Sequence, residues 1–516
     1  MDSNQNTEKI WDIQFEPITV GEHNCNINRR REDLYLLINF SDAVPKYTPE
    51  LGPHLEIFQK DKNKPIIMPL NSAVTTKMLI PNSKNMSDSE YYKTFIEAKK
   101  PIIESLIKNI YAKGYEFPSA VQAISIPELI QCKDAMVQFK SGTGKTGAFT
   151  IGLLFGYDPN DNCLQYLFIT NSHEVAKQIY AQVKELLPES AKIALCIGQK
   201  KDVRSMSDGG FKAPISTSSL NYKPKSIKEE RDEVSNAQII VCTMGKFYDY
   251  MCNKKWITKY QYLKAICVDE FDNIVASRSK SRNSTVMSTE DQMAAIMKQI
   301  PELAQRVFFS ATVDEQALQI AHSYFRPYKP SIGEPFIVLL DNEDYTLEGI
   351  RQYYVQVSSI QVKKEVLIDL IKQCRIAQCI IFTNQIRTAN EIKYLLDEQD
   401  VPISSAVFHG ELSASTREAI HKEFLAGDIR FLVSTDLTAR GFDAQSVNVV
   451  INFDMPENLA TYIHRVGRSG RYGRKGVAIS LILTGVRNEM KKVDRINEVS
   501  KFSKMDSLPE DLANLL

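Results

Sequence analysis

Short apolar runs alternate with segments of helical periodicity along most of this chain, starting at about residue 100. The first series is rich in Val, Ile and aromatic residues and comprises YLFIT at 166, IALCIG at 193, AQIIVCT at 237, KAICVDE at 264 and RVFFSAT at 306. The second comprises IRQYYVQV at 350, AQCIIFTN at 377, SAVFHG at 405, RFLVSTD at 430, NVVINFD at 448 and GVAISLIL at 476. Strands that alternate with helices predict βαβ units, so each series indicates an α/β domain with a mostly parallel sheet.

The boundaries of these domains follow from the composition of the segments between the apolar runs. Residues 1–94 mix short apolar pieces with Pro, Asn and both charge signs, which predicts a partly ordered extension. We assign residues 95–340 to the first domain, the polar stretch 341–349 to a linker and residues 350–516 to the second domain. Two polar insertions, at about 203–235 and 276–290, are predicted to be exposed loops within the first domain.

Composition narrows the class of protein. The 516 residues carry a formal net charge of zero, with 43% hydrophobic and 24% charged residues, as in soluble globular proteins. No apolar run approaches the roughly 18 residues of a membrane span, and the first residues lack the pattern of a secretory signal. The nine cysteines form no CxxC pair, which argues against a zinc site or a disulfide framework. We expect an intracellular protein, in the cytoplasm rather than the nucleus.

The stretch FKSGTGKTGAF, from Phe139, lies between an apolar run and a helical pattern, which is where a phosphate-binding loop belongs. In a loop of this kind backbone N–H groups converge on phosphate oxygens, and we expect Lys145 to reach the outer phosphates and Thr146 to hold Mg²⁺. The strict phosphate-loop pattern GxxxxGK[ST] begins with a glycine, and Phe139 stands at that position. An ordinary glycine-rich turn is therefore the alternative interpretation. The remaining loop residues assigned to the nucleotide are Ser141, Gly142, Thr143 and Gly144.

The acidic stretch VDEFDNI follows the apolar run that ends at Val268. A phosphate loop needs a carboxylate on a neighbouring strand to hold the metal, and a group to orient the attacking water. Asp269 suits the role of metal ligand, and Glu270 suits the role of orienting the water. The alternative interpretation of this stretch is a solvated strand end.

Together these segments resemble the DEAD-box family of ATP-dependent RNA helicases, with DEFD in place of DEAD. The resemblance covers about 95–516 and implies two tandem RecA-like domains that use ATP and Mg²⁺. TLEGIRQYYV and INFDMP are similar to the minimal-core members typified by the translation initiation factor helicase.

The resemblance assigns further residues to the nucleotide. GYEFPSAVQ, residues 114–122, looks like the Q motif, in which Gln122 reads the adenine edge beside Tyr115. Phe95 is the candidate adenine-stacking ring, with a core aromatic as the alternative. STDLTARGFD places Asp443 on the ribose, next to Gly441.

HRVGRSGR, residues 464–471, resembles the segment that brings Arg468 and Arg471 to the γ-phosphate as arginine fingers. These guanidinium groups act only when the second domain closes on the first, so closure gates hydrolysis. The residues expected to couple the two domains are Asp272, Ser310, Thr312, His464 and Arg465.

RNA is the partner that the resemblance implies, gripped by its backbone with weak sequence preference. The matching positions are Ser172, Glu174, Gly198, Thr243, Gly245 and Lys246 in the first domain and Thr383, Arg417 and Thr435 in the second. The alternative for each of these residues is an ordinary polar group on the surface. His173, Ala414 and Gln199 depart from the family, which favours weaker RNA binding or a different surface.

Several alternatives stay open. The leading hypothesis is a helicase that opens short RNA duplexes, and the second is an ATP-gated RNA clamp with slow turnover, which recruits proteins through residues 1–94 and 203–235. A DNA helicase is disfavoured by the Q motif. Phe139 and Phe271 replace alanines of the family, and we expect small neighbours to absorb their volume and hydrolysis to survive.

Overall fold

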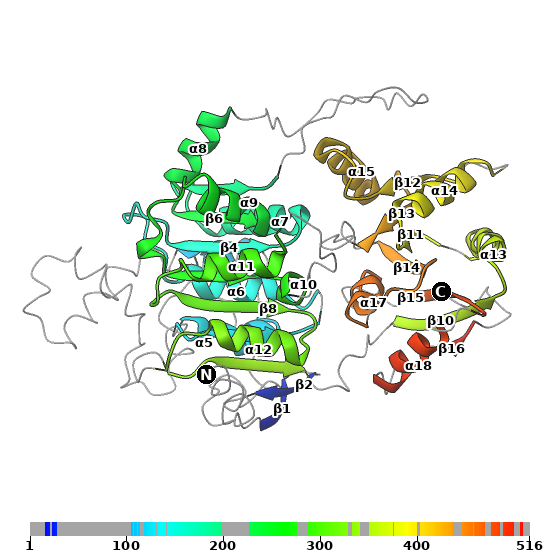
Figure 1. Ribbon diagram of the computed structural model, residues 1–516, viewed down its shortest axis with the longest axis horizontal. Coiled ribbons are helices and arrows are strands. Elements are labelled where there is room, and N and C mark those ends of the chain that lie inside the picture. The colour runs from blue at the N-terminus through cyan, green and yellow to red at the C-terminus, as the bar shows by residue number, and fades with distance from the viewer. Residues whose placement is uncertain are drawn as a thin grey trace, which may run out of the picture.

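The protein is described from a computed structural model, which defines the chain in segments. These are residues 16–20, 23–27, 105–106, 108–110, 112–113, 118–130, 132–140, 142–198, 226–275, 287–328, 333–340, 350–374, 376–399, 403–436, 446–457, 459–469, 476–485, 489–499 and 506–508. Figure 1 shows two sheets flanked by helices, one from each half of the chain. The prediction of two tandem α/β domains is thereby confirmed.

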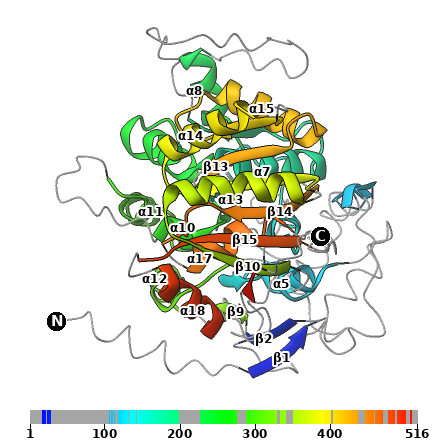
Figure 2. The same cartoon turned by 90° about the vertical axis from the view of Figure 1, so that its right-hand side faces the viewer.

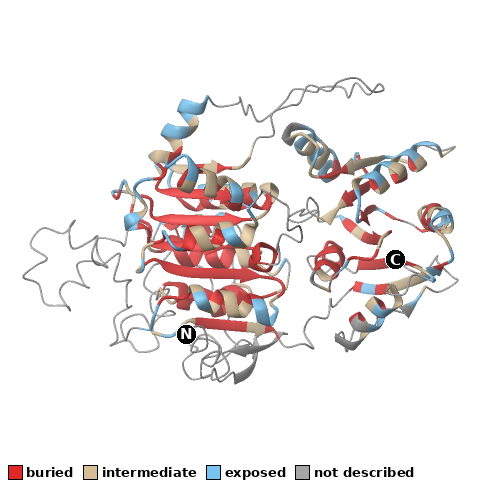
Figure 3. Cartoon of the chain, in the orientation of Figure 1, coloured by how far each residue is buried: buried red, intermediate tan, exposed pale blue. Residues whose placement is uncertain are grey.

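The first domain is built on a nine-stranded sheet in the order β1-β2-β9-β3-β8-β7-β4-β6-β5. Its strands are β1 (Glu16–Val20), β2 (His23–Ile27), β3 (Ala135–Gln138), β4 (Tyr166–Thr170), β5 (Ile193–Cys196), β6 (Ile239–Thr243), β7 (Ala265–Val268), β8 (Gln305–Ser310) and β9 (Phe336–Leu340). The strands from β9 to β5 are parallel, and those in the middle are buried along their whole length, as parallel strands covered on both faces are (Figure 3). The pairing of β2 with β9 adds two strands of the N-terminal extension to this sheet.

Helices cover both faces of the first sheet. One face packs against α5 (Ala120–Ile130), α6 (Lys145–Leu154) and α7 (His173–Leu186). The other face packs against α9 (Met244–Tyr248), α10 (Phe271–Val275), α11 (Thr289–Met297) and α12 (Glu315–Tyr324). The sheet therefore separates two hydrophobic cores.

The prediction that residues 203–235 form an exposed loop is wrong for their last part. Residues 227–235 form α8 (Ile227–Ser235), which begins with a capping box between Ser226 and Glu229 and buries Val234. The polar composition of this segment gave no helical pattern of apolar residues, because α8 buries a single apolar side chain, that of Val234. The second insertion likewise ends at Ser288, whose side chain caps α11.

The second domain is built on a seven-stranded sheet in the order β12-β13-β11-β14-β15-β10-β16, with all its pairs parallel. Its strands are β10 (Ile350–Val357), β11 (Gln378–Thr383), β12 (Ser405–Phe408), β13 (Phe431–Thr435), β14 (Val447–Asn452), β15 (Gly476–Leu483) and β16 (Asp506–Ser507). One face packs against α13 (Ile360–Gln373) and α14 (Ile386–Asp397). The other packs against α15 (Ala414–Ala426), α17 (Leu459–Val466) and α18 (Glu489–Val499), and Figure 2 looks onto this domain.

The candidate functional segments follow the carboxyl ends of strands. The phosphate loop follows β3, the acidic segment follows β7 and the SAT segment ends β8. Because these three strands are neighbours and parallel, their carboxyl ends meet at one edge of the sheet. The fold thus collects motifs that lie far apart in the sequence.

None of the helices that the structure describes combines the length and the apolar character that crossing a membrane requires.

Candidate functional site between the two domains

The phosphate loop leaves β3 and enters α6 directly. Gly142 and Gly144 have φ angles of 78° and 96°, in the left-handed region that glycine adopts without steric cost. Gly144 is the N-cap of α6, and no side chain caps the helix there. The N-terminus of a helix suits a phosphate group, because its first N–H groups point along the helix axis and the helix dipole favours negative charge there.

Lys145 lies over the carbonyl oxygens of its own loop. Its Nζ donates to Phe139 O and to Lys140 O, each at 2.7 Å, and Thr143 Oγ1 donates to Lys140 O at 2.8 Å. Reaching an outer phosphate requires the ammonium group to exchange these bonds for phosphate oxygens. Thr146, the candidate metal residue, is half-buried in the first turn of α6.

Gln122 packs against the phosphate loop. Its Nε2 donates to Gly144 O at 3.3 Å, and its Oε1 accepts from Ser119 N at 3.0 Å. A Cβ atom at Gly144 would lie 2.8 Å from Gln122 Nε2, and one at Gly147 would lie 2.5 Å away. The two glycines are therefore required by this buried side chain, whereas the adenine contact of Gln122 stays a prediction.

The acidic segment makes a sharp turn after β7. Asp269 N continues the ladder by donating to Ile169 O at 2.9 Å, and the chain then turns at Glu270, whose φ is +54°. A side chain in this region costs about 1–3 kcal/mol and persists only where the surroundings enforce it, which is typical of active sites. Glu270 Oε2 is also buried and has no hydrogen-bond partner in the described part of the chain.

Burial and the neighbouring charge of Glu270 raise the pKa of Asp269 to about 7, although the Lys145 ammonium opposes the shift. A divalent cation would relieve both unfavourable effects, so Asp269 fits a metal ligand. Among the described residues there is no cluster of three or more His, Cys, Asp or Glu side chains able to hold a metal. Mg²⁺ bound with phosphates needs only one or two protein carboxylates.

Asp272 joins the two domains. Its carboxylate accepts from Ser310 Oγ and from Thr312 Oγ1, each at 2.6 Å, and from His464 Nε2 of the second domain at 3.3 Å. Burial by itself raises the pKa of Asp272, but the hydrogen bond and charge of His464, together with the two hydroxyl groups, lower it to about 2. Four of the five residues expected to couple the domains thus lie in one cluster.

Arg465, the fifth, is buried within the second domain. Its guanidinium donates to both carboxylate oxygens of Asp436, to Asp454 O at 2.6 Å and to Asn384 Oδ1 at 2.7 Å. These contacts bind α17 to the loops after β11, β13 and β14, and a role of Arg465 in coupling stays a prediction. The sequence analysis missed this network because Asp436 and Asn384 belong to other motifs.

Arg468 is buried at the end of α17, where its Nε donates to His464 O at 3.0 Å. The arginine is thus tied to the residue that contacts the first domain. Six predicted nucleotide residues fall outside the described part of the chain: Phe95, Tyr115, Ser141, Gly441, Asp443 and Arg471.

The candidate RNA residues of the two domains contact each other directly. Arg417 Nη1 donates to Glu174 Oε1 at 2.8 Å, and Arg417 Nη2 donates to His173 Nδ1 at 3.2 Å. Ser172 caps α7 and donates from its Oγ to Glu174 Oε2 at 3.0 Å. RNA bound at these residues would meet side chains that are already engaged with one another.

A second cluster lies where β5 and β6 end. Gly198 lies against His173, since a Cβ there would be 3.7 Å from His173 Nε2, and Thr243 is the buried N-cap of α9. Gly245 faces Gln292, with Oε1 3.6 Å from the place of a Cβ.

Lys246 is held by a residue that the sequence analysis did not single out. Its Nζ lies 3.3 Å from Glu230 Oε1 of α8 and 4.6 Å from the centre of the Tyr250 ring. The Tyr250 hydroxyl donates to the same carboxylate. The insertion helix therefore supplies the counter-charge of a candidate RNA contact.

In the second domain, Thr383 ends β11 and is fully buried, and its Oγ1 donates to Gln385 O at 3.1 Å. Thr435 ends β13 and is half-buried. Both lie at the carboxyl edge of the second sheet, although their RNA contacts stay a prediction.

Family comparison agrees with this geometry. The chain matches the DEAD/DEAH box helicase family over residues 119–320 and the helicase conserved C-terminal domain over residues 362–473. A relative from Acanthamoeba polyphaga mimivirus, whose name places it among the ATP-dependent RNA helicases, is 62% identical over 99% of this chain and 100% of its own length. This chain belongs to the DEAD-box ATP-dependent RNA helicases.

More distant members of the family agree. The ATP-dependent RNA helicase eIF4A of Mycosarcoma maydis is 32% identical, over 84% of this chain and 95% of its own length. The structure of S. cerevisiae Dbp5 bound to RNA and ADP BeF3 matches with a TM-score of 0.63 and 29% identity, over 79% of this chain and 94% of that one. The two RecA-like domains and the resemblance drawn from the motifs are confirmed.

The two phenylalanines that depart from the family pattern are both fully buried in this helicase. Phe139 belongs to the core on one face of the first sheet and Phe271 to the core on the other. One neighbour of Phe271 is large, because its ring centroid lies 4.5 Å from that of Phe308. The accommodation of both rings by small neighbours and the survival of hydrolysis stay predictions.

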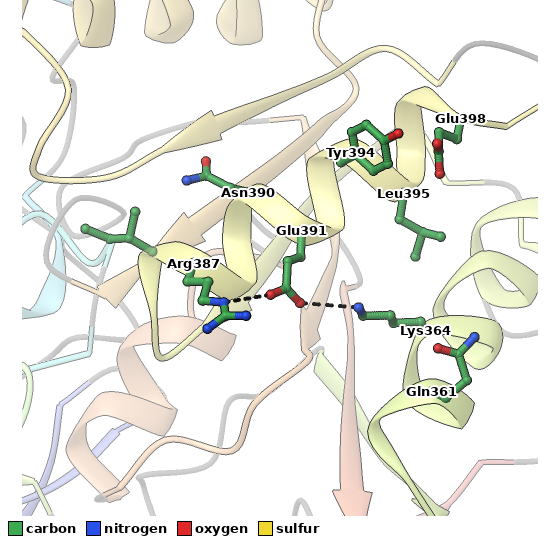
Figure 4. Close-up of a pocket in the computed structure, with 9 residues that line it drawn as sticks. Gln361, Lys364, Arg387, Asn390, Glu391, Tyr394, Leu395 and Glu398 are labelled. Atoms are coloured by element: carbon green, nitrogen blue, oxygen red, sulfur yellow. Dashed lines mark hydrogen bonds and ion pairs between the residues drawn. The ribbon is translucent and has the colours of Figure 1, made fainter. Parts of the chain in front are cut away.

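A hollow of about 730 Å³ lies outside this site, between α13 and α14 of the second domain (Figure 4). An ion-pair chain crosses it, in which Glu391 bridges Lys364 and Arg387 at 3.3 and 3.1 Å. Its lining residues are Gln361, Lys364, Ile386, Arg387, Asn390, Glu391, Tyr394, Leu395 and Glu398.

Proposed function

We propose that this helicase closes its two domains over single-stranded RNA when ATP and Mg²⁺ are bound, hydrolyses the ATP and separates short RNA duplexes locally. The observation that carries the proposal is the contact of His464 Nε2 with Asp272 Oδ2 at 3.3 Å. Because Arg468 is bonded to His464 O, the same contact keeps the arginine-bearing segment at the cleft. Closure then brings Arg468 and Arg471 to the terminal phosphate, where they stabilise developing charge.

The first domain supplies the remaining chemistry. Lys145 leaves its loop carbonyls for the outer phosphates, Thr146 and Asp269 hold Mg²⁺, and Glu270 orients the attacking water. Mg²⁺ supplies positive charge to the phosphate oxygens when it is bound. The strained backbone and the unpartnered Oε2 of Glu270 support its role as a polar group kept ready for a ligand.

RNA binds across the same cleft through its backbone. Its phosphates attract Arg417 and Lys246, which are now paired with Glu174 and Glu230. Such local contacts explain how a chain of zero net charge binds a polyanion. Since ATP and RNA both favour the closed arrangement, each raises the affinity for the other.

ATP hydrolysis with and without single-stranded RNA tests the proposal. We expect RNA to stimulate the unsubstituted protein and Glu270→Gln to abolish the stimulated rate. Glu398→Gln, on the outer face of the second domain, is the control and keeps full activity. Absence of hydrolysis in the unsubstituted protein rejects the function.

Duplex length provides a second readout. Base stacking contributes about 1.4 kcal/mol per step in DNA, so ten steps cost on the order of 14 kcal/mol. One closure event therefore opens only short duplexes, and processive unwinding of long ones contradicts the proposal.

An ATP-gated RNA clamp is the second candidate. The contacts of Arg417 with Glu174 and of Lys177 with Glu418, at 2.8 and 2.7 Å, favour it because they join the two domains at the edge where the candidate RNA residues lie. Retention of RNA for minutes after ATP addition supports the clamp, whereas fast release supports the helicase.

A further inference from the structure

The ring of Phe271 lies on the ring of Phe308, at a centroid distance of 4.5 Å and an interplanar angle of 36°. Both side chains are completely buried. Phe308 in turn lies 5.7 Å from the ring of Phe325, which follows α12. The ring of Phe271 thereby attaches the short helix α10 to β8, and Phe308 continues the aromatic contact to the end of α12.

The contact is part of a two-point attachment. Phe308 and Ser310 are two residues apart in β8, so their side chains leave the same face of the sheet. Phe271 stacks on the first, and the adjacent Asp272 accepts a hydrogen bond from the second at 2.6 Å. Neighbouring residues of the acidic segment thus engage successive same-face positions of one strand.

Phe271 also follows Glu270, the residue with the left-handed backbone. A strained conformation persists only where the residues on either side are held firmly. On the upstream side, Glu270 N donates to Asp269 Oδ1 at 2.9 Å. On the downstream side the buried Phe271 ring fixes the chain.

We propose that Phe271 and Phe308 form an aromatic anchor that positions Glu270 for the reaction and Asp272 for its contact with the second domain. The anchor rests on the proposed function, because it acts through the orientation of Glu270. It sets the rate of turnover and not the affinity for nucleotide, because Lys145 and the phosphate loop lie outside the contact. Phe271 is a positioning residue and touches no substrate.

The strand provides a matched control. Phe309 is the next residue of β8, is equally buried and packs against Phe149 on the opposite face, with ring centroids 5.3 Å apart. Replacing Phe308 or Phe309 by Leu removes the same ring from the same strand. Only the first replacement touches the acidic segment.

The experiment compares Phe308→Leu with Phe309→Leu in the full chain, measuring Tm, kcat and KM for ATP at saturating single-stranded RNA. We expect both to lower Tm, and only Phe308→Leu to lower kcat, by about two- to tenfold, the range that an aromatic pair supports. KM for ATP stays unchanged in both. Should either Leu variant fail to fold, the Met variants at both positions remove the rings with a smaller change of volume.

A double-mutant cycle measures the contact itself. The kcat of Phe271→Leu combined with Phe308→Leu should match that of the single variants, whereas the effects of Phe271→Leu and Phe309→Leu should multiply. Equal loss of kcat in Phe308→Leu and Phe309→Leu, or multiplying effects for Phe271 and Phe308, overturns the anchor. An unsubstituted protein without RNA-stimulated hydrolysis overturns the proposed function and the anchor together.

Discussion

Glu230 should weaken RNA binding by occupying Lys246, and Glu230→Gln should therefore bind single-stranded RNA more tightly. The two side chains are 28% and 17% exposed and lie 3.3 Å apart, so solvent screens the pair only in part. Ion pairs near the surface contribute about 0.2–1 kcal/mol, and removing this competitor should lower the Kd for RNA by about 1.4- to 5-fold. The Tyr250 hydroxyl keeps a partner, because the amide oxygen of Gln still accepts.

Salt titration separates this effect from a general change of charge. A released lysine adds one phosphate contact, which makes the slope of log K against log salt steeper by about 0.7 for a single strand. Asp232→Asn is the control, since it removes the same charge from an exposed position of the same helix. Fluorescence anisotropy with a labelled oligoribonucleotide measures both quantities. An unchanged Kd and slope in Glu230→Gln, or an equal gain in Asp232→Asn, refutes the reasoning.

Three further predictions concern the cleft. The pKa of Asp269 is raised from its ordinary 3.8 to about 7, so the folded protein binds this proton more tightly than the unfolded chain, and stability is lost as pH rises from 3.8 to about 7. The Tm of Asp269→Asn should not show this loss, and parallel pH profiles of the two proteins contradict the prediction. His173→Arg should place two guanidinium groups together where Arg417 now donates to His173, and their repulsion should separate the two domains. Small-angle scattering of the protein without nucleotide should then show a larger radius of gyration. An unchanged radius rejects this prediction. Gly147→Ala should lower the free energy of unfolding by about 1–3 kcal/mol in denaturant titrations, because its Cβ would lie 2.5 Å from Gln122 Nε2. Adding Gln122→Ala should restore much of this loss. A Gly147→Ala protein of unchanged stability argues against the contact.

The strands and the segments that carry the chemistry could be predicted from local signals in the sequence. Every apolar run of the two series became a strand, because a buried parallel strand needs a continuous stretch of Val, Ile and aromatic residues. The phosphate loop and the acidic segment were recognised for the same reason, since each chemistry requires particular residues at fixed spacing. The hairpin of β1 and β2 was not foreseen, because its short strands complete a sheet edge far away in the sequence.

Local signals in the sequence did not indicate which side chains contact one another within the site. Glu230 was hidden in a polar insertion, and nothing in its surroundings points to Lys246. The alternation in RVFFSAT does place Phe308 on the face of Ser310, and this signal could have led to Phe271.

The sequence alone therefore determined the two α/β domains, the family and the loops that carry its chemistry, because strand periodicity and motif spacing are properties of neighbouring residues. Tertiary structure decided which side chains meet: Asp272 with His464, Glu174 with Arg417, and Phe271 with Phe308. The first two pairs are 192 and 243 residues apart and join different domains, and the third joins a helix and a strand of the first domain. Their contact depends on how the helices pack and where the domains lie. Packing of this kind is set by the whole core, and no short stretch of sequence specifies it.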